Sequence, residues 1–268
     1  MALKVESMTS NDLKGLKVLE LASVLAGPAV GTFLAELGAE VVKIENPKTG
    51  GDVTRGWKLS SEDPDSATSA YFCSVNYGKT HRFLDLSNEA DLAEVQRLAA
   101  NSDIIIANYR AGQAEKFGLD FASIQVQNPS VIYGNIIGFE TTDSRPAFDV
   151  ALQAETGYMF MNGQPESAPT KMPVALIDVL AAHQMKEAIL LALLNREKHG
   201  KGAYVSVSLF DAAISALTNQ ASNWLMNGHV PQRIGSLHPN IAPYGEILNT
   251  SDNKMIVLAI GSDKQFNS

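Results

Sequence analysis

Short apolar segments alternate with amphipathic ones along most of this chain. Residues 17–21 and 41–45 each form a short apolar run that is typical of a buried strand. Between them, Gly27-Pro28 breaks the backbone, and the apolar residues that follow have the spacing of one helix face. A strand, a helix and a strand in this order place the two strands parallel in one sheet. The pattern therefore predicts a strand–helix–strand unit over residues 16–45.

The same alternation continues toward the C-terminus. It predicts an α/β fold with an open, mostly parallel, Rossmann-like sheet and helices on both faces. The further strands are expected at residues 82–86, 103–107, 131–137 and 203–208, and the further helices at residues 88–100, through 117, before 129, at 150–158, from about 178 onward and at 209–226.

The pattern becomes irregular in two places. Residues 46–80 are rich in Gly, Ser, Asp, Pro and Thr, and a loop of this length within a domain is often functional. Near the C-terminus, residues 246–260 are expected to form a hairpin that turns at 251–253, with no closing helix after it. We therefore expect a large α/β domain at residues 1–210, and a linker helix with a partial small α+β domain at residues 211–268.

The junction between the first strand and its helix is a place where a ligand can bind, because free backbone N–H groups point outward there. The segment 26–31 lacks the G-x-G-x-x-G fingerprint, and the chain contains no G-x-x-x-x-G-K-[ST] motif. From the local residues alone, a tight turn and a ligand-contact loop are equally good interpretations.

Composition restricts the partners. The formal net charge of −8 over 268 residues, without basic runs, argues against nucleic acid as the main partner. Cys73 is the single cysteine, which fits a reducing compartment, and we expect a cytoplasmic location. Residues 1–15 do not resemble a signal peptide, and no apolar run reaches the roughly 18 residues that span a bilayer, so no membrane partner is expected.

Four segments in this order resemble one known family. They are the opening unit at 16–45, Asn108-Tyr109-Arg110, Pro173 with Asp178 five residues later, and GKGAYVSVSLFDA at 200–212. Together they are similar to the class III coenzyme A transferases, the group of formyl-CoA transferase, carnitine CoA-transferase and alpha-methylacyl-CoA racemase. Members of this family are longer, so the resemblance implies that the C-terminal part of the family fold is missing here. It also implies a homodimer.

The resemblance implies that Asp178 is the catalytic nucleophile. A carboxylate can attack an acyl-CoA thioester to give a mixed anhydride and then an aspartyl-CoA thioester, which divides one difficult exchange into easier steps. That chemistry needs no metal and no permanently bound cofactor, because CoA enters as part of the substrate. Without the resemblance, an N-cap is the favoured interpretation of an aspartate at the start of a helix, since capping aspartates are common, and both roles are compatible.

The resemblance also implies a set of coenzyme A contacts. Asn46 departs from it, since several members carry arginine at this position. Arg110 and Lys116 are alternatively solvated surface charges, and His238 is either an acyl-site contact or an exposed loop histidine. The expected CoA contacts are Leu25, Ala26, Leu84, Asp85, Asn108, Tyr109, Arg110, Lys116, Arg145, Phe148 and Asp149, with His238 toward the acyl substrate.

The family contains more than one activity. Racemase chemistry needs a second base, a histidine before aspartate, where this chain has Phe148, so transfer of CoA from an acyl-CoA to a carboxylic acid is the favoured function. A racemase-type enzyme and a catalytically impaired CoA-binding protein remain as alternatives, as does an α/β protein with an unrelated small-molecule site. The acyl donor and acceptor are not specified by the residues.

Overall fold

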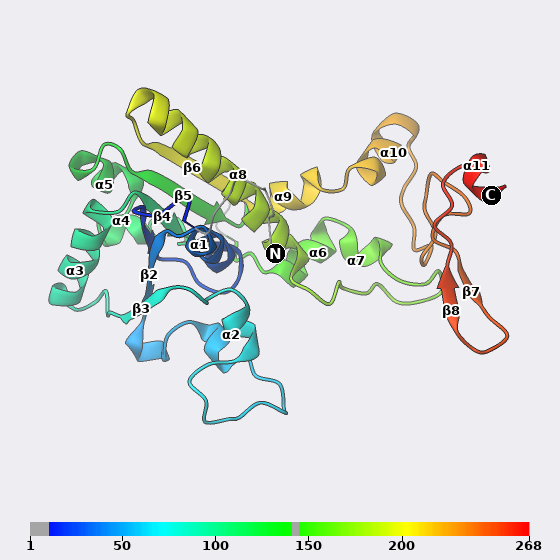
Figure 1. Cartoon of the computed structure of the whole chain (residues 1–268), viewed down its shortest axis with the longest axis horizontal. Coiled ribbons are helices and arrows are strands. Elements are labelled where there is room, and N and C mark those ends of the chain that lie inside the picture. The colour runs from blue at the N-terminus through cyan, green and yellow to red at the C-terminus, as the bar shows by residue number, and fades with distance from the viewer. Residues whose placement is uncertain (1–10, 141–144, 268) are drawn as a thin grey trace. The chain divides into compact units, whose positions relative to one another are not determined.

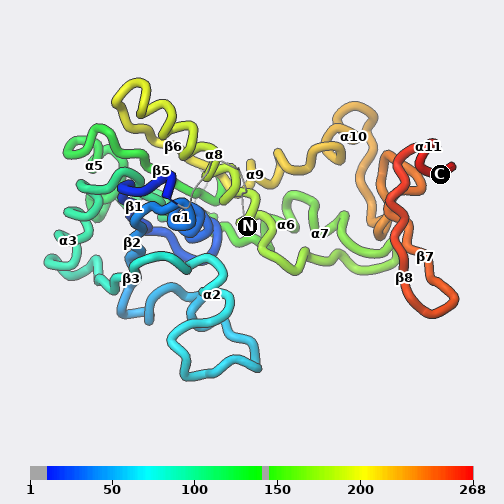
Figure 2. Tube along the Cα trace, viewed as in Figure 1, coloured from blue at the N-terminus to red at the C-terminus, as the bar shows by residue number. Residues whose placement is uncertain are grey.

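The computed structural model describes residues 11–140 and 145–267, which form two compact units (Figures 1 and 2). The first unit comprises Met1–Ala147 and Ile177–Ala212, and the second comprises Phe148–Leu176 and Ala213–Ser268. The expected boundary at residue 210 lies close to Ala212. Residues 148–176, which we expected within the large domain, belong to the second unit.

A six-stranded sheet forms the centre of the first unit, with the strand order β3-β2-β1-β4-β5-β6. Every neighbouring pair in it is parallel, which confirms the predicted α/β class. This is the order of a dinucleotide-binding sheet, and the direction of winding reverses between β1 and β4. The strands are β1 (Lys17–Glu20), β2 (Glu40–Glu45), β3 (Thr80–Phe83), β4 (Ile104–Ala107), β5 (Ile132–Ile137) and β6 (Ala203–Ser208).

Helices cover this sheet, as Figure 1 shows. They begin where the sequence supplies a cap: Asn88, for example, accepts hydrogen bonds from the Ala90 and Asp91 N–H groups at the start of α3. The expected long loop at 46–80 contains two short 3-10 helices and α2. The elements are α1 (Ala26–Glu36), η1 (Pro47–Thr49), η2 (Val53–Gly56), α2 (Ala70–Ser74), α3 (Glu89–Ala100), α4 (Gln113–Lys116), α5 (Phe121–Gln127), α8 (Leu176–His199) and α9 (Leu209–Ser215).

Alternating strand residues divide the core into two faces. On one face, Leu19, Ile105 and Tyr133 pack with Val95 of α3 and Ile124 of α5, and all of these side chains are buried. We call this group the α3–α5 cluster. The sheet therefore buries apolar residues on both sides, as a parallel sheet requires.

The opposite face packs against α1 and α8, and glycines make the close approach there. A Cβ added to Gly27 of α1 would lie 2.2 Å from the Ala22 Cβ, and one added to Gly134 of β5 would lie 2.9 Å from the Met185 sulfur of α8. Only glycine allows these backbones to come so close to their neighbours. The two helices are thus seated directly on the sheet.

The second unit holds short helices and the expected hairpin. Its strands β7 (Ile247–Asn249) and β8 (Met255–Val257) are antiparallel, and Asn253 in the turn between them has a φ of 60°. This confirms the predicted turn at 251–253. The helices are α6 (Asp149–Glu155), α7 (Tyr158–Met161), α10 (Asn219–Asn227) and α11 (Asp263–Phe266).

Three helix predictions are wrong in this region. The helix expected at 209–226 is divided into α9 and α10, and the backbone of Thr218 has a φ of 44°, which a right-handed helix does not accommodate. The helix expected at 150–158 ends at Glu155, and Gly157, with a φ of 86°, separates it from α7. The short helix α11 follows the hairpin, where none was expected.

Candidate active site

The position of Asp178 follows from the direction of helix α8. Near its C-terminal end, Arg196 contacts Asp103 with an N–O distance of 3.2 Å and also donates to the Ser130 backbone oxygen. Asp103 directly precedes β4, so this end of the helix lies at the amino edge of the sheet. Because α8 runs antiparallel to the strands, as the crossover between β5 and β6 requires, its N-terminus lies at the carboxyl edge.

Helix α8 also lies beside α1, which begins at that same edge. The ammonium group of Lys186 in α8 is 5.3 Å from the ring centre of Phe33 in α1. Asp178 is about 12 Å along the helix axis before Lys186, and Ala26 is about 10 Å before Phe33, at 1.5 Å per residue. Asp178 and Ala26 are therefore at nearly the same height on this face of the sheet.

The local setting of Asp178 suits a reactive carboxylate. The helix begins at Leu176, so Asp178 lies within the first turn rather than at the residue that precedes the helix. Its side chain is half-buried, next to the buried Ile177 and one turn before the small, buried Ala181. Unpaired N–H groups at a helix start favour negative charge nearby, and this holds for an oxyanion as well as for the carboxylate itself.

The turn between β1 and α1 is joined to the end of β4. Asn108, just after β4, accepts a hydrogen bond from the Ser23 N–H at 3.2 Å and donates one to the Ser23 carbonyl at 2.9 Å. Leu25 directly precedes α1 and is half-buried, while Ala26 is the first residue of the helix and is 5% exposed. Three predicted contacts therefore come together where the sheet reverses its winding, which is the usual ligand position in this architecture.

The residues after Asn108 differ in how much of them reaches solvent. Tyr109 packs against the α3–α5 cluster, and its burial raises the pKa of the phenol to about 12, so the hydroxyl stays neutral. Arg110 and Lys116 are exposed. Their positions are compatible both with phosphate contact and with ordinary surface charges, so these two roles remain predictions.

A second group of predicted contacts lies at the ends of β2 and β3. Leu84 donates its N–H to the Glu45 carbonyl at 3.0 Å and packs against the α3–α5 cluster. The carboxylate of Asp85 lies 2.7 Å from Lys48, and the bonds from Lys48 and then Ser87 lower its pKa to about 2. The loop that carries Leu84 and Asp85 therefore lies at the carboxyl edge of the sheet, as the β1–α1 turn does.

Glu45, the last residue of β2, is buried, and both of its carboxylate oxygens are bonded to other residues of the protein. Its two oxygens lie 2.7 Å from the Nε and Nη2 atoms of Arg55, and Oε1 lies 2.7 Å from Nδ1 of His81. Oε2 also accepts the Asp52 N–H at 2.8 Å. Burial alone would raise the pKa of this carboxyl, but the bonds from Arg55, His81 and Asp52 hold it well below its usual range.

The remaining predicted residues fall on both sides of the unit boundary. Arg145 belongs to the first unit, with its guanidinium 4.1 Å from the Phe139 ring centre. The second unit contains the other three: Phe148 is 63% exposed, Asp149 accepts a bond from Gln153 at 2.6 Å, and Nδ1 of His238 accepts the Asn240 N–H at 3.1 Å. Their roles at the thioester remain predictions.

Sequence reasoning missed Ser23. Its signal was its position, since it directly follows the first apolar run and precedes the helix-breaking Gly27-Pro28. Within the described part of the chain, no cluster of three or more His, Cys, Asp or Glu residues is arranged to hold a metal ion. Across residues 11–140 and 145–267, no helix combines the length and the apolar character needed to cross a membrane.

Comparison with known proteins identifies the family of this chain. Residues 13–268 match the model of CoA-transferase family III. The succinate–glutarate CoA-transferase of Agrobacterium fabrum is 39% identical over 260 residues, which are 95% of this chain and 64% of that relative. The succinyl-CoA:mesaconate CoA-transferase of Haloarcula hispanica is 34% identical over 255 residues, 92% of this chain and 64% of the relative.

A solved structure shows the same fold. The crystal structure of a CAIB/BAIF family protein from Brucella suis superposes with a TM-score of 0.84 at 39% identity, over 96% of this chain and 68% of that one. The chain spans 64% of the length of the two curated relatives. The family match covers nearly all of the sequence, and the chain belongs to CoA-transferase family III.

Proposed function

We propose that this protein transfers coenzyme A from an acyl-CoA thioester to a carboxylic acid, with Asp178 as the nucleophile. The observation that carries the proposal is the place of Asp178 at the start of α8, level with the β1–α1 turn. A carboxylate at that position reaches a ligand bound at the carboxyl edge of the sheet, where α/β proteins bind their ligands. Membership of a family whose named relatives are CoA-transferases supports the same reaction.

The first half of the reaction forms an aspartyl-CoA thioester. A carboxylate oxygen of Asp178 attacks the thioester carbonyl carbon, the carbon–sulfur bond breaks, and CoA leaves as the thiolate while a mixed anhydride remains. The thiolate then attacks Cγ of Asp178 and releases the donor acid as its carboxylate. The N–H groups in the first turn of α8 stabilise the oxyanion that develops at each attack.

The second half reverses these steps with the acceptor. The acceptor carboxylate attacks the aspartyl thioester at Cγ, which gives a new mixed anhydride and again frees the thiolate. The thiolate attacks the acceptor's carbonyl carbon, and the carboxylate of Asp178 is restored. Each bond to sulfur is exchanged for another, so the thioester energy is retained without ATP, and CoA is a substrate rather than a bound cofactor.

The substrates that we propose are short dicarboxylic acids and their CoA thioesters. The names of the two relatives include succinate, glutarate and mesaconate, which share two carboxyl groups and a short carbon chain. In such a substrate one carboxyl group takes part in the exchange, and the other needs a positively charged or hydrogen-bonding partner. Turnover with succinyl-CoA and a panel of mono- and dicarboxylic acceptors tests this class.

The decisive experiment looks for the covalent intermediate. The protein is incubated with succinyl-CoA and measured by mass spectrometry, with Asp178→Ala as the control. A CoA-sized mass increase on the peptide that contains residue 178, absent from the variant, is expected. CoA binding without an adduct would instead identify a CoA-binding protein without turnover, and the lack of any CoA binding would refute the proposal.

We also propose that the protein self-associates as a homodimer and acts in the cytoplasm. Leucines on the outer side of α8 support association, since Leu191 is 67% and Leu194 is 60% exposed. Sedimentation velocity that detects only monomer across a wide range of concentrations would contradict the dimer. Fluorescence of a tagged chain in its source cells tests the location, for which the single cysteine is the supporting observation.

A further inference from the structure

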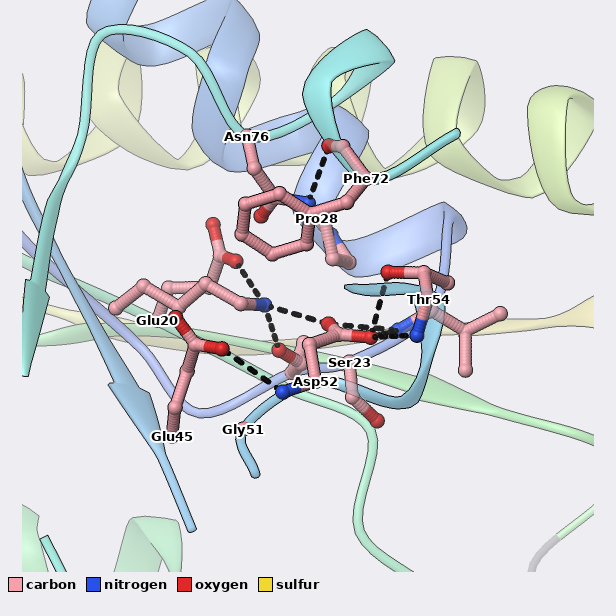
Figure 3. A network of polar contacts seen from close by, with 12 residues as sticks. Glu20, Ser23, Pro28, Glu45, Gly51, Asp52, Thr54, Phe72 and Asn76 are labelled. Carbon is pink, nitrogen blue, oxygen red and sulfur yellow. Dashed lines mark hydrogen bonds and ion pairs between the residues drawn. The ribbon is translucent and has the colours of Figure 1, made fainter. Parts of the chain in front are cut away.

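A network of buried charges lies beneath the β1–α1 turn (Figure 3). Lys43 of β2 is 1% exposed, and its ammonium nitrogen lies 2.8 Å from Glu20 of β1 and 3.0 Å from Asp52. Lys79 lies 2.7 Å from the other oxygen of Glu20. Two positive and two negative groups thus balance one another, as buried charges must.

The network reaches the turn at two backbone atoms. Lys43 donates to the Ala22 carbonyl at 2.7 Å, and Oδ2 of Asp52 accepts the Val24 N–H at 3.1 Å. Asn108 holds the residue between them, Ser23, through both of its backbone groups. Three consecutive residues immediately before Leu25 are therefore fixed by side chains from β2, from the β4 loop and from Asp52.

The backbone at Val24 needs such support. Its φ is 73°, in the left-handed region that β-branched residues rarely adopt, and a conformation of this kind persists only where surrounding contacts enforce it. The bond from Val24 N–H to Asp52 is the contact that acts directly on this residue. It sets the direction in which the following residues, Leu25 and Ala26, leave the strand.

Asp52 is itself rigidly held, through hydrogen bonds to both of its oxygens. Oδ1 accepts the Thr54 N–H at 3.1 Å, the Thr54 hydroxyl at 2.8 Å and a longer bond from the Val24 N–H at 3.4 Å, while Oδ2 accepts the shorter Val24 bond and faces Lys43. Burial alone would lower the pKa of Lys43, but the attraction of Glu20 and Asp52 raises it above its ordinary value, so the ammonium group stays charged. Both oxygens of Asp52 are acceptors, and neither site tolerates a donor.

We propose that Asp52 is a positioning residue for coenzyme A binding. It holds Val24 in the left-handed conformation, and the turn thereby presents the backbone of Leu25 and Ala26 to the ligand. The inference rests on the proposed function, since coenzyme A is the ligand. It assigns to Asp52 and its partner Lys43 a role in affinity, although both are buried below the turn and neither is assigned any contact with CoA.

The variant Asp52→Asn tests this directly. An asparagine keeps the shape but must point its NH2 group either at the Thr54 donors, which removes their bonds, or at Lys43, which leaves Val24 with only the longer bond at 3.4 Å. By isothermal titration calorimetry, the Kd for CoA is expected to rise about ten-fold, the effect of losing one hydrogen bond to a charged group. The milder Thr54→Val removes one donor to Asp52, and an increase of about three-fold is expected.

Asp103→Asn is the matched control. Like Asp52, Asp103 pairs with a positively charged residue, here Arg196, and accepts a backbone N–H, that of Lys17 at 2.9 Å, but at the opposite edge of the sheet. Its Kd for CoA should equal that of the unmodified protein. An unchanged Kd in Thr54→Val, and in Asp52→Asn where that variant folds, would overturn the inference.

A second measurement keeps the two proposals separable, because it needs no CoA. Hydrogen exchange followed by NMR should show faster exchange at the Val24 amide in Asp52→Asn, with the Leu19 amide in β1 unchanged. If the unmodified protein fails to bind CoA, the proposed function is wrong, while the exchange rates still decide whether Asp52 holds the turn. Equal exchange at Val24 in the two proteins would refute the positioning role.

Discussion

The side-chain amide of Asn108 forms two hydrogen bonds with the backbone of a single residue, Ser23, although 85 positions separate them in the chain. This pairing closes the gap between β1 and β4, where the winding of the sheet reverses. It behaves like one additional step of the ladder that joins these strands. The β1–α1 turn and the β4 loop are consequently linked, and we expect each to move only together with the other.

Asn108→Ala should therefore weaken both folding and CoA binding. Two neutral hydrogen bonds are lost, and the free energy of unfolding measured in urea is expected to fall by about 1–2 kcal/mol. The Kd for CoA should rise as well. Asn101→Ala, which removes a bond to the Arg97 carbonyl at the end of α3, serves as the control whose Kd stays constant. An Asn108→Ala protein with unaltered affinity would mean that the two loops bind independently.

Gly31 in α1 is expected to resist substitution. A Cβ at this position would lie 1.9 Å from Oε2 of Glu20, an atom that cannot retreat because Lys79 holds it at 2.7 Å. Gly31→Ala should lower the free energy of unfolding by about 2 kcal/mol, since overpacking outweighs the higher helix propensity of alanine. Gly56→Ala, where no atom lies within 4 Å of the added Cβ, should cost nothing. Equal stability of the two variants would contradict the tight fit of Glu20.

The Glu45 carboxyl should dominate part of the acid denaturation curve. Its pKa is lowered in the folded protein from the ordinary 4.5, so its stabilising effect is fully present above pH 4.5 and is lost as the pH falls through the lowered pKa. One such group adds a slope of at most about 1.4 kcal/mol per pH unit to the free energy of unfolding.

Glu45→Gln measures this contribution. At pH 7 the variant should be less stable by about 2 kcal/mol, because a charged bond to Arg55 becomes a neutral one. Below pH 4.5 its stability should fall less steeply than that of the unmodified protein, and the two curves should converge. The exposed Glu187→Gln provides the reference curve. Parallel curves for Glu45→Gln and the unmodified protein would show that another group governs the acid limb.

Asp178→Glu probes the geometry of the proposed nucleophile. The longer side chain keeps the carboxylate but displaces it by roughly one carbon–carbon bond, and a misplacement of about 1 Å can slow a positioned reaction by about a hundred-fold. Single-turnover formation of the aspartyl-CoA adduct should slow accordingly, while the Kd for CoA stays the same. A glutamate variant that forms the adduct at the original rate would argue against a precisely placed attack.

The strands could largely be predicted from the chain because their apolar runs are short and bounded. The prediction of residues 203–208 matches β6, where alternation is regular, and Asn88 was rightly placed at the start of its helix region. At the sheet edge the prediction at 82–86 was displaced from β3, since Thr80 and His81 are polar yet belong to the strand. Hydropathy alone does not detect an edge strand of this kind.

Other features depended on contacts between distant residues. Nothing local to the segment 209–226 indicates the break near Thr218, since its residues continue an amphipathic pattern. Glu20 and Lys43 are charged residues inside apolar strands. The sequence does not show that they form a buried ion pair, because the pairing depends on the neighbouring positions of their strands in the sheet. Asp178 was recognisable through the family resemblance. Its position at the same height as Ala26 could not be predicted, because it depends on how α8 packs against α1.

The way Glu45 is bound has a consequence for which nucleotides this sheet can accept. In dinucleotide-binding proteins with the same strand order, an acidic residue at the end of the second strand recognises the ribose hydroxyls. Here Arg55 and His81 already occupy that carboxylate. With both of its oxygens bonded inside the protein, Glu45 is not available to accept hydrogen bonds from the ribose hydroxyls of a nicotinamide cofactor.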